Sequence, residues 1–337
     1  MTTAPGPSEE TSPPADALNM IKGAIAEINL PKLIAGPAGE AISRLIAGGA
    51  DVPAAWLEQK AKSIRNKTEA QNLVSKTLAG AAAEFVKNDP ELVQRAADVF
   101  LAREIRHQYN REAVAIKTIE HLKETPNSEA NTPEDDWLNV FARHAQEASS
   151  DRLQDIWARV LAGQIRKPQC FSLQTLRFIS ELDMHIAAMF EKWSNWVISS
   201  DYIAFPAKGG ADFTELLQLE DFGLITGATG QLSKTFEAQS PTLPEEKPLW
   251  GFEFRDHICL VRFTSPTPVS LPSVLLTRVG RELYSISKTQ GSIEPIKRFA
   301  EQFPKHNVVG IQYIHKPATQ DAGAIDLWTL PSPTGQQ

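Results

Sequence analysis

The sequence is poor in cysteine, in long apolar runs and in positive charge. Its 337 residues include only two cysteines, Cys170 and Cys259, which stand far apart and outside any Cys-x-x-Cys pair. A disulfide framework, a thiolate zinc site and a dithiol redox motif are therefore excluded, and a reducing compartment fits. No run of about 18 apolar residues is present, so no membrane-spanning helix is predicted. A net charge of -7 argues against a surface built wholly around nucleic acid, although it is compatible with a local basic strip.

The first 16 residues hold no Lys or Arg, so they lack the basic region of a signal peptide. They contain three acidic residues and four prolines, and no apolar stretch. We expect a disordered leader over residues 1–16 and a short tail over residues 332–337. Together with the isolated thiols, this composition predicts a cytoplasmic protein.

Helix-forming residues dominate the first half of the chain. Ala, Leu, Lys, Glu and Gln are frequent over residues 17–124, and strand signals are almost absent. We expect helices over Leu18–Leu30, Gly39–Gly48 and about Ala54–Val86. Asp89 and Pro90 are typical of an N-cap and a first-turn proline, and they open a helix with an apolar stripe. The stripe recurs every three or four residues through Val93, Ala97, Leu101, Ile105, Tyr109, Ala113 and Ile116.

A second helical region follows a polar linker. Residues 124–131 form the linker, and the Thr-Pro-Glu-Asp sequence from Thr132 has the spacing of a capping box at the start of the next helix. Ser150 and Ser172 are expected to cap two further helices. A fourth helix is expected over about Leu182–Val197, and the aromatic residues of these helices are expected to pack together.

The character of the sequence changes after about residue 202, where Gly, Pro and Thr are frequent and apolar residues alternate. Strands are expected over Phe252–Phe263, Ser273–Thr277, Val308–His315 and Ile325–Leu330. Helices are expected over Phe213–Leu219, Arg278–Ser287 and Ile293–Phe303. The predicted fold is mainly α with a C-terminal α+β domain, that is, a helical bundle followed by a winged-helix-like domain. The expected domains are a helical N-terminal region (17–130), a central helical domain (131–200) and an α+β domain (201–331).

Two phrases in the last third of the chain give it the winged-helix-like pattern. Leu219–Ile225 combines the end of a helix with a Gly-Leu-Ile strand start, and Leu275–Leu283 contains Leu-Thr-x-x-Gly-x-x-Leu. Winged helices also serve as protein-interaction modules, so the pattern does not imply DNA. The expected recognition surface carries Glu215, Glu220 and Asp221 in place of a Lys/Arg cluster, which argues against DNA.

No convergent set of catalytic residues is identifiable. Gly227–Thr235 imitates a phosphate-binding loop, but Ser233 stands where a P-loop needs Gly, so a turn is favoured. Asp135 and Asp136 point about 100° apart on a helix, and the helix dipole explains them. Among the seven histidines no pair has the spacing of a zinc helix. We therefore predict no catalytic, cofactor-binding or metal-binding residue and, with Gly227–Thr235 as the one alternative, no enzyme.

Two segments are candidates for binding. Residues 57–76 hold five basic and two acidic residues, a local charge of +3, and the basic residues are Lys60, Lys62, Arg65, Lys67 and Lys76. They are candidates for contact with nucleic acid or another anionic surface, although a solvated helix face explains them as well. Residues 17–50 combine Gly and Ala with branched aliphatics, which suits a segment that leans on lipid or on another helix. Charged residues interrupt this segment, which favours packing on the chain's own helices.

Three phrases in the central block carry a resemblance to a known family. They are Asp-Asp-Trp-Leu-x-x-Phe from Asp135, the run from Ser150 to Pro168, and Phe-Ser-Leu-x-Thr-Leu from Phe171. Over about residues 111–190 the chain closely resembles the bacterial family called domain of unknown function 2806. The residues that carry the resemblance include Asp136, Trp137, Phe141, Gln154, Trp157, Leu161, Gly163, Pro168, Ser172 and Thr175. The chain has Gln169 where Gly is common in that pattern.

The resemblance implies no activity, cofactor or catalytic residue, because the shared residues are those of a packed helical scaffold. A second, weaker resemblance links the Gly-rich lead-in and the central helices to abortive-infection proteins of the alpha type, which are associated with phage resistance. We expect a non-enzymatic regulatory or interaction protein in stress or phage response that binds a protein partner or self-associates. Two alternatives stay open: a membrane-active effector with peripheral contact through residues 17–50, and a nucleic-acid-binding protein that uses the basic segment or the winged-helix-like domain.

Overall fold

The computed structural model describes residues 36–46, 90–124, 131–230, 232–237, 247–266, 268–287, 291–316 and 323–329. By its internal contacts the chain divides into two compact units, Met1–Leu176 and Arg177–Gln337. The leader, the tail and the helices expected over Leu18–Leu30 and Ala54–Val86 lie outside the described residues.

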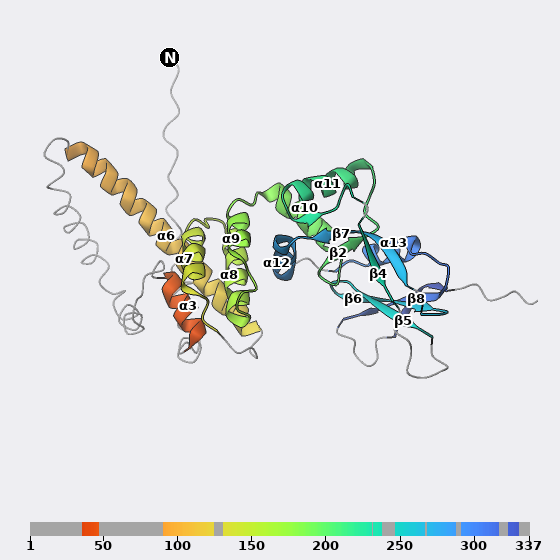
Figure 1. Cartoon of the computed structure of the whole chain (residues 1–337). Coiled ribbons are helices and arrows are strands. Elements are labelled where there is room, and N and C mark those ends of the chain that lie inside the picture. The colour runs from red at the N-terminus through yellow and green to blue at the C-terminus, as the bar shows by residue number, and fades with distance from the viewer. Residues whose placement is uncertain are drawn as a thin grey trace, which may run out of the picture. The chain divides into compact units, whose positions relative to one another are not determined.

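The described part of the first unit is built from helices (Figure 1). They are α3 (Pro37–Ile46), α6 (Pro90–Glu124), α7 (Asp135–Ala145), α8 (Asp151–Arg166) and the start of α9 (Leu173–Ser180). The Ser150 hydroxyl accepts a hydrogen bond from the Leu153 amide at 3.2 Å, and the Ser172 hydroxyl accepts one from the Thr175 amide at 3.3 Å. Both predicted caps are thereby confirmed, since each satisfies an amide that has no partner within its first helical turn.

The helices of the first unit pack around one another. The C-terminal half of α6 runs along α8, and α3 contacts α6, α7 and α8. Ala41, Ile42 and Leu45 of α3 are buried, so this short helix contributes its apolar side to the core. The described part of the segment 17–50 is therefore packed on the chain's own helices, as the charged residues within it favour.

Two details of the helical prediction are wrong. The predicted stripe of α6 is not its buried face: Leu101, Ile105 and Tyr109 are exposed, whereas His107, Asn110 and Val114 are buried. Thr132 does not cap α7, because the helix begins only at Asp135, and the Thr132 hydroxyl instead donates to Glu40 Oε2 at 3.1 Å. Asp135 stands in the first turn, as predicted, and accepts a hydrogen bond from Arg44.

The second unit combines helices with two antiparallel sheets (Figure 1). After the end of α9, its elements are α10 (Met184–Ser194), β1 (Val197–Ile198), β2 (Tyr202–Ala204), α11 (Gly210–Asp221), β3 (Ile225–Thr226), β4 (Ser233–Phe236), β5 (Leu249–Glu253), β6 (His257–Phe263), β7 (Val269–Leu276), α12 (Arg278–Ile286), α13 (Glu294–Gln302), β8 (Val308–His315) and β9 (Ile325–Thr329). One sheet has the order β1-β2-β7-β3 with β4 also paired to β7, and the other has the order β5-β6-β8-β9. The expected α+β character of the C-terminal region is confirmed.

A single aromatic-rich core joins the two sheets and α13. Phe252 of β5 lies 4.8 Å from Phe299 and 5.7 Å from Phe303, measured between ring centroids. Leu271 of β7 and Tyr202 of β2 belong to the same buried cluster. Because large aromatic side chains bury much apolar area, this cluster contributes strongly to the hydrophobic stabilisation of the second unit.

Several strand predictions need correction. The run Phe252–Phe263 is a hairpin of two strands, since the Phe254 amide donates to the His257 carbonyl at 2.9 Å and reverses the chain between β5 and β6. Val197 lies in β1, where it pairs with Ile203 of β2, so it does not continue α10. Strands β1 to β4 are two to four residues long, too short for an alternating pattern to reveal them.

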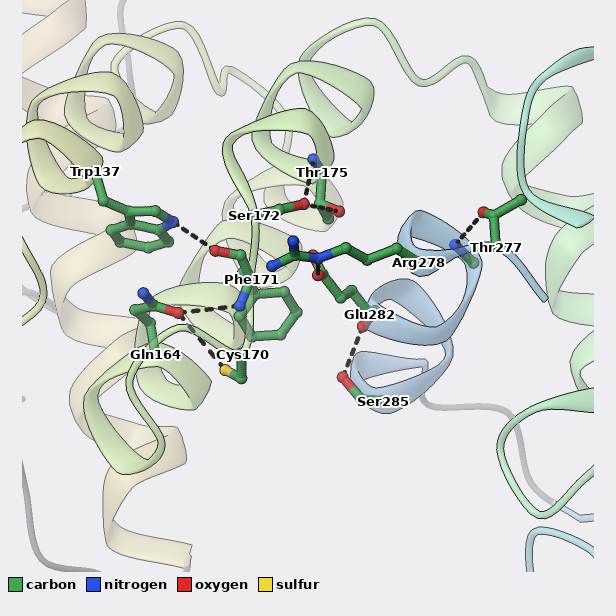
Figure 2. A network of polar contacts seen from close by, with 11 residues as sticks. Trp137, Gln164, Cys170, Phe171, Ser172, Thr175, Thr277, Arg278, Glu282 and Ser285 are labelled. Atoms are coloured by element: carbon green, nitrogen blue, oxygen red, sulfur yellow. Dashed lines mark hydrogen bonds and ion pairs between the residues drawn. The ribbon is translucent and has the colours of Figure 1, made fainter.

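The two winged-helix-like phrases meet in space. Ile225 of β3 pairs with Leu276 at the end of β7, and the Thr277 amide donates to the Leu224 carbonyl at 3.0 Å. Thr277 caps α12 by accepting a hydrogen bond from the Gly280 amide at 3.1 Å (Figure 2). A Cβ atom on Gly280 would lie only 2.0 Å from the Leu224 carbonyl oxygen. Glycine is therefore required where α12 crosses the start of β3.

Candidate interaction surface

The residues that carry the family resemblance lie mainly in the core of the first unit. Trp137 and Phe141 stack at 5.2 Å on the inner face of α7, and Trp157 of α8 meets Phe141 edge-on at 5.3 Å. Leu161 is fully buried one turn after Trp157. These aromatic contacts join α7 to α8 and explain why large apolar residues recur at this spacing.

The loop between α8 and α9 is held by hydrogen bonds between its backbone and the side chains of Trp137 and Gln164 (Figure 2). Trp137 Nε1 donates to the Phe171 carbonyl at 2.8 Å, and the Phe171 amide donates to Gln164 Oε1 at 3.1 Å. Gly163 gives the Phe171 ring its space, because a Cβ there would lie 2.6 Å from ring atom Cε2. The φ of Gln169 is 63°, a left-handed conformation that favours glycine, which accounts for the glycine of the family pattern at this position.

The other motif residues also have structural roles. The buried Gln154 amide nitrogen donates to the Ala148 carbonyl at 3.0 Å and fixes the turn between α7 and α8. Ser172 and Thr175 form the cap of α9 (Figure 2). Asp136 and Pro168 are exposed, in the first turn of α7 and in the loop after α8. The motif thus builds a scaffold and assembles no reactive group.

The most unusual surface of the first unit lies on the N-terminal half of α6. Val99 is 69% exposed, Phe100 42% and Ile105 54%, although all three are large apolar residues. An open hollow of about 440 Å³ there is lined by Arg95, Ala96, Val99, Phe100 and Arg103. We call this exposed stretch of α6 the α6 apolar surface; its apolar side chains, Val99, Phe100, Leu101 and Ile105, point to more than one side of the helix.

One face of α6 continues from the packed half of the helix into the exposed half. His107, Asn110 and Val114 are buried against the helices that follow, and Ala96, Phe100 and Arg103 precede them in the same alternating steps of four and three residues. That spacing keeps residues on one side of a helix. The side of α6 that packs on α7 and α8 therefore continues toward the N-terminus of α6, where its residue Phe100 is exposed.

Polar contacts anchor α6 where its packed half begins. Asn110 Nδ2 donates to the Gln146 carbonyl at 2.7 Å, and Arg111 donates to Gln146 Oε1 at 2.9 Å. Burial lowers the pKa of Arg111, an effect that Glu104 and Glu112 oppose. The polar contacts that join α6 to the end of α7 and the start of α8 begin at Arg106, which lies 3.8 Å from Glu147. The α6 apolar surface precedes them in the sequence.

The exposure of Val99 and Phe100 was not predicted from the sequence. The predicted stripe passes through Leu101 and Ile105, which lie on the same half of α6 but on another side of the helix than Phe100. The register of Phe100 with the buried Asn110 and Val114 was the available signal. The basic candidates Lys60, Lys62, Arg65, Lys67 and Lys76 lie outside the described residues.

The loop that imitates a phosphate site is occupied by the protein's own carboxylate. Glu220 Oε1 accepts hydrogen bonds from the amides of Gly227 at 2.5 Å and Ala228 at 3.3 Å. Lys234 lies in β4 and pairs with Asp201, away from those amides along the chain. The observed contacts agree with the prediction of a turn, because the amide donors and the cation that a phosphate would need already have partners.

Two further features are absent from the part of the chain that the structure describes. Within that part, no helix is long and apolar enough to cross a membrane. Over the same residues, no group of three or more His, Cys, Asp or Glu side chains is arranged to hold a metal ion.

Comparison with known proteins gives one family. No curated protein and no solved structure matches the chain. Residues 94–202 match the family model described as "Protein of unknown function (DUF2806)", a range that runs from the exposed half of α6 to the first residue of β2. The similarity to abortive-infection proteins stays a prediction. The match over residues 94–202 confirms the resemblance to the family called domain of unknown function 2806.

Proposed function

We propose that this chain is a non-enzymatic interaction protein that self-associates through the α6 apolar surface. The observation that supports the proposal is the exposure of Val99, Phe100 and Ile105 on a helix whose other half is packed in the core. The partner in this proposal is the corresponding half of α6 in a second copy of the chain.

The physical argument concerns the cost of leaving these side chains in water. Covering a Val, Ile or Phe side chain contributes roughly 1.5–3 kcal/mol, so a contact that covers several on each of two copies is favourable. The alternating spacing of four and three residues that leads through Phe100 is that of helices that pack side by side. Apolar residues on more than one side of the same helical half favour a site between neighbouring helices.

The charges near the surface suit an antiparallel pair. Arg95 lies 3.5 Å from Glu91, and Arg103 lies 3.4 Å from Glu104, so each end of the surface carries both signs. Two copies aligned head to tail would bring Arg95 of one toward Glu104 of the other. Such exposed ion pairs add at most about 1 kcal/mol each, and they set the alignment more than the affinity.

The setting that we propose is the bacterial cytoplasm, in a regulatory role in stress or phage response. Its support is the isolated thiols and the resemblance to abortive-infection proteins of the alpha type. We further propose that α11, β3, β7 and α12 form a winged-helix-like module for protein contacts. Its support is the pairing of β3 with the end of β7 directly before α12.

No observation favours the two alternatives over self-association. The described residues of the segment proposed for membrane contact, α3, bury Ala41, Ile42 and Leu45. The basic residues proposed for nucleic acid lie outside the described residues. Within the described residues, no set of converging reactive side chains supports an enzymatic function.

Analytical ultracentrifugation over a concentration series tests the proposal. We expect a dimer at micromolar concentration for the full chain and a monomer for the Val99→Glu/Phe100→Glu variant. Leu173→Glu is the matched control, because Leu173 is 49% exposed and lies on α9, outside the proposed surface. A full chain that stays monomeric throughout the series, or a variant that dimerises as well as the control, would refute the proposal.

A further inference from the structure

Two histidines that are far apart in the sequence are neighbours in the second sheet. His257 is the first residue of β6 and His315 the last of β8, and the two are directly opposite in the antiparallel pairing. Their ring centroids lie 4.3 Å apart, with the ring planes tilted by 49°. Residues opposite one another across two strands present their side chains to the same face, so both imidazoles stand together at one end of the sheet.

An open cavity of about 570 Å³ lies at this end of the sheet. It is lined by Asp256, His257, Gly291, Ile293 and His315. His257 is only 5% exposed, and its Nδ1 atom has no hydrogen-bond partner among the described residues. A buried ring nitrogen without a partner is costly, and such atoms in native structures mark a site for water, an ion or a ligand.

We propose that His257 and His315 bind a divalent transition-metal ion of the zinc class, with water or a small ligand from the cavity completing its coordination. Imidazole is a preferred ligand for zinc, copper and nickel. Zinc–nitrogen bonds are about 2.0–2.1 Å long, so two nitrogens on one tetrahedral ion lie roughly 3.3 Å apart. Rings whose centroids are separated by 4.3 Å allow that approach with small rotations of the side chains.

The surroundings keep His257 in the form that binds metals. Burial is the first cause that lowers its pKa, and His315 and Lys316 lower it further, while Asp256 acts in the opposite direction. A lowered pKa keeps the imidazole neutral, with a lone pair available, at neutral pH. The Lys316 ammonium is paired with Glu253, which reduces its repulsion toward a bound cation.

Two neighbouring residues bear on the site. Asp256 Oδ2 accepts a hydrogen bond from the Gly291 amide at 2.5 Å, which holds this carboxylate in the cavity wall, where its negative charge favours a bound cation. Cys259 follows His257 on the same face, but its side chain is fully buried in the aromatic core of the unit and does not line the cavity.

Isothermal titration of the metal-stripped full chain with Zn²⁺, and Co²⁺ absorption spectra of the same samples, test the proposal. We expect saturable binding of one ion per chain in the unmodified protein and its loss in His315→Ala. His315 is exposed, so its removal leaves the core unchanged. His306→Ala is the matched control, because His306 is also exposed and lies in the turn before β8, and it should bind as the unmodified chain does.

Two outcomes would overturn the proposal. One is the absence of saturable binding by the unmodified chain, and the other is binding by His315→Ala as tight as that by His306→Ala. A pH series provides an independent readout: the affinity should fall as the pH drops below the ordinary pKa of histidine, near 6.5, because protonated imidazole cannot bind the ion. Affinity that does not change with pH would also contradict binding by histidine. The site lies away from α6 in the sequence, so its outcome is independent of the test of self-association.

Discussion

Replacing Gly280 by alanine tests the crossing of α12 over β3. The added Cβ would lie 2.0 Å from the Leu224 carbonyl oxygen and 3.1 Å from the carbonyl carbon, and both atoms are backbone. Relief requires a shift of about 1 Å, since carbon and oxygen that are not bonded normally stay more than about 3 Å apart. The shift disturbs the hydrogen bond from the Thr277 amide to the Leu224 carbonyl, which is 3.0 Å long.

The magnitude follows from three opposing contributions. Overpacking of a close contact costs about 1–3 kcal/mol, and weakening of one backbone hydrogen bond costs about 1 kcal/mol. Alanine recovers about 1 kcal/mol through its higher helix propensity. We therefore expect Gly280→Ala to lower the free energy of unfolding by about 2 kcal/mol, or the melting temperature by about 4–8 °C for a unit of this size.

Thermal and urea unfolding, followed by circular dichroism and tryptophan fluorescence, measure this loss. Gly209→Ala is the matched control, because nothing lies within 4 Å of its Cβ position and its φ of -175° is extended backbone. At that N-cap position, glycine's advantage over alanine is offset by the reduced entropy of the unfolded chain, so the expected change is close to zero. If Gly280→Ala has the same melting temperature and urea midpoint as Gly209→Ala, the close approach of α12 to Leu224 is refuted.

Three further predictions concern the core and the caps. Gly163→Ala should lower the free energy of unfolding by about 1 kcal/mol, measured by urea unfolding. A Cβ 2.6 Å from the buried Phe171 ring costs about 1–3 kcal/mol, and the higher helix propensity of alanine returns about 1 kcal/mol; a variant more stable than the unmodified chain would contradict this. Ser150→Ala should cost about 1 kcal/mol in the same assay through loss of the α8 cap, and Ser150→Asp should restore it. At pH 8 a thiol reagent should modify Cys170 and leave Cys259 unmodified until the chain is unfolded. The reason is that thiolate is the reactive form and burial raises the pKa of Cys259 to about 12. Rapid modification of both thiols in the folded chain would be the contrary result.

Local signals in the sequence were sufficient for elements whose ends are set by their own residues. Ser150 and Ser172 mark the starts of α8 and α9 because a hydroxyl must satisfy nearby amides wherever such a helix begins. Strand β8, Val308–His315, agrees with its predicted range because its alternation of buried and less buried residues is long enough to be distinct. In these cases the information lies within a few residues of the boundary.

The errors arise where partners distant in the sequence decide the structure. The buried face of α6 is set by α7 and α8, which accept polar residues such as Asn110 through specific hydrogen bonds, so the more apolar stripe through Ile105 was misleading. Strand β2 is recognisable only through its pairing with β1 and β7. The pair of His257 and His315 likewise depends on the register of β6 with β8, which no spacing along the chain reveals.

The structure separates residues that the fold requires from residues that it does not. Trp137 and Trp157, at the centre of the family resemblance, are explained by their packing, so substituting them would unfold the first unit without testing a function. Phe100 lies within the same matched range, but its exposure leaves no stabilising role in the described structure for a large apolar side chain there. An apolar residue that the fold does not require, in register with a packed face, has its simplest explanation in a partner that covers it. Within residues 94–202 of this chain, the exposed half of α6 is therefore where substitutions test a function without disturbing the fold, whereas the buried tryptophans are not.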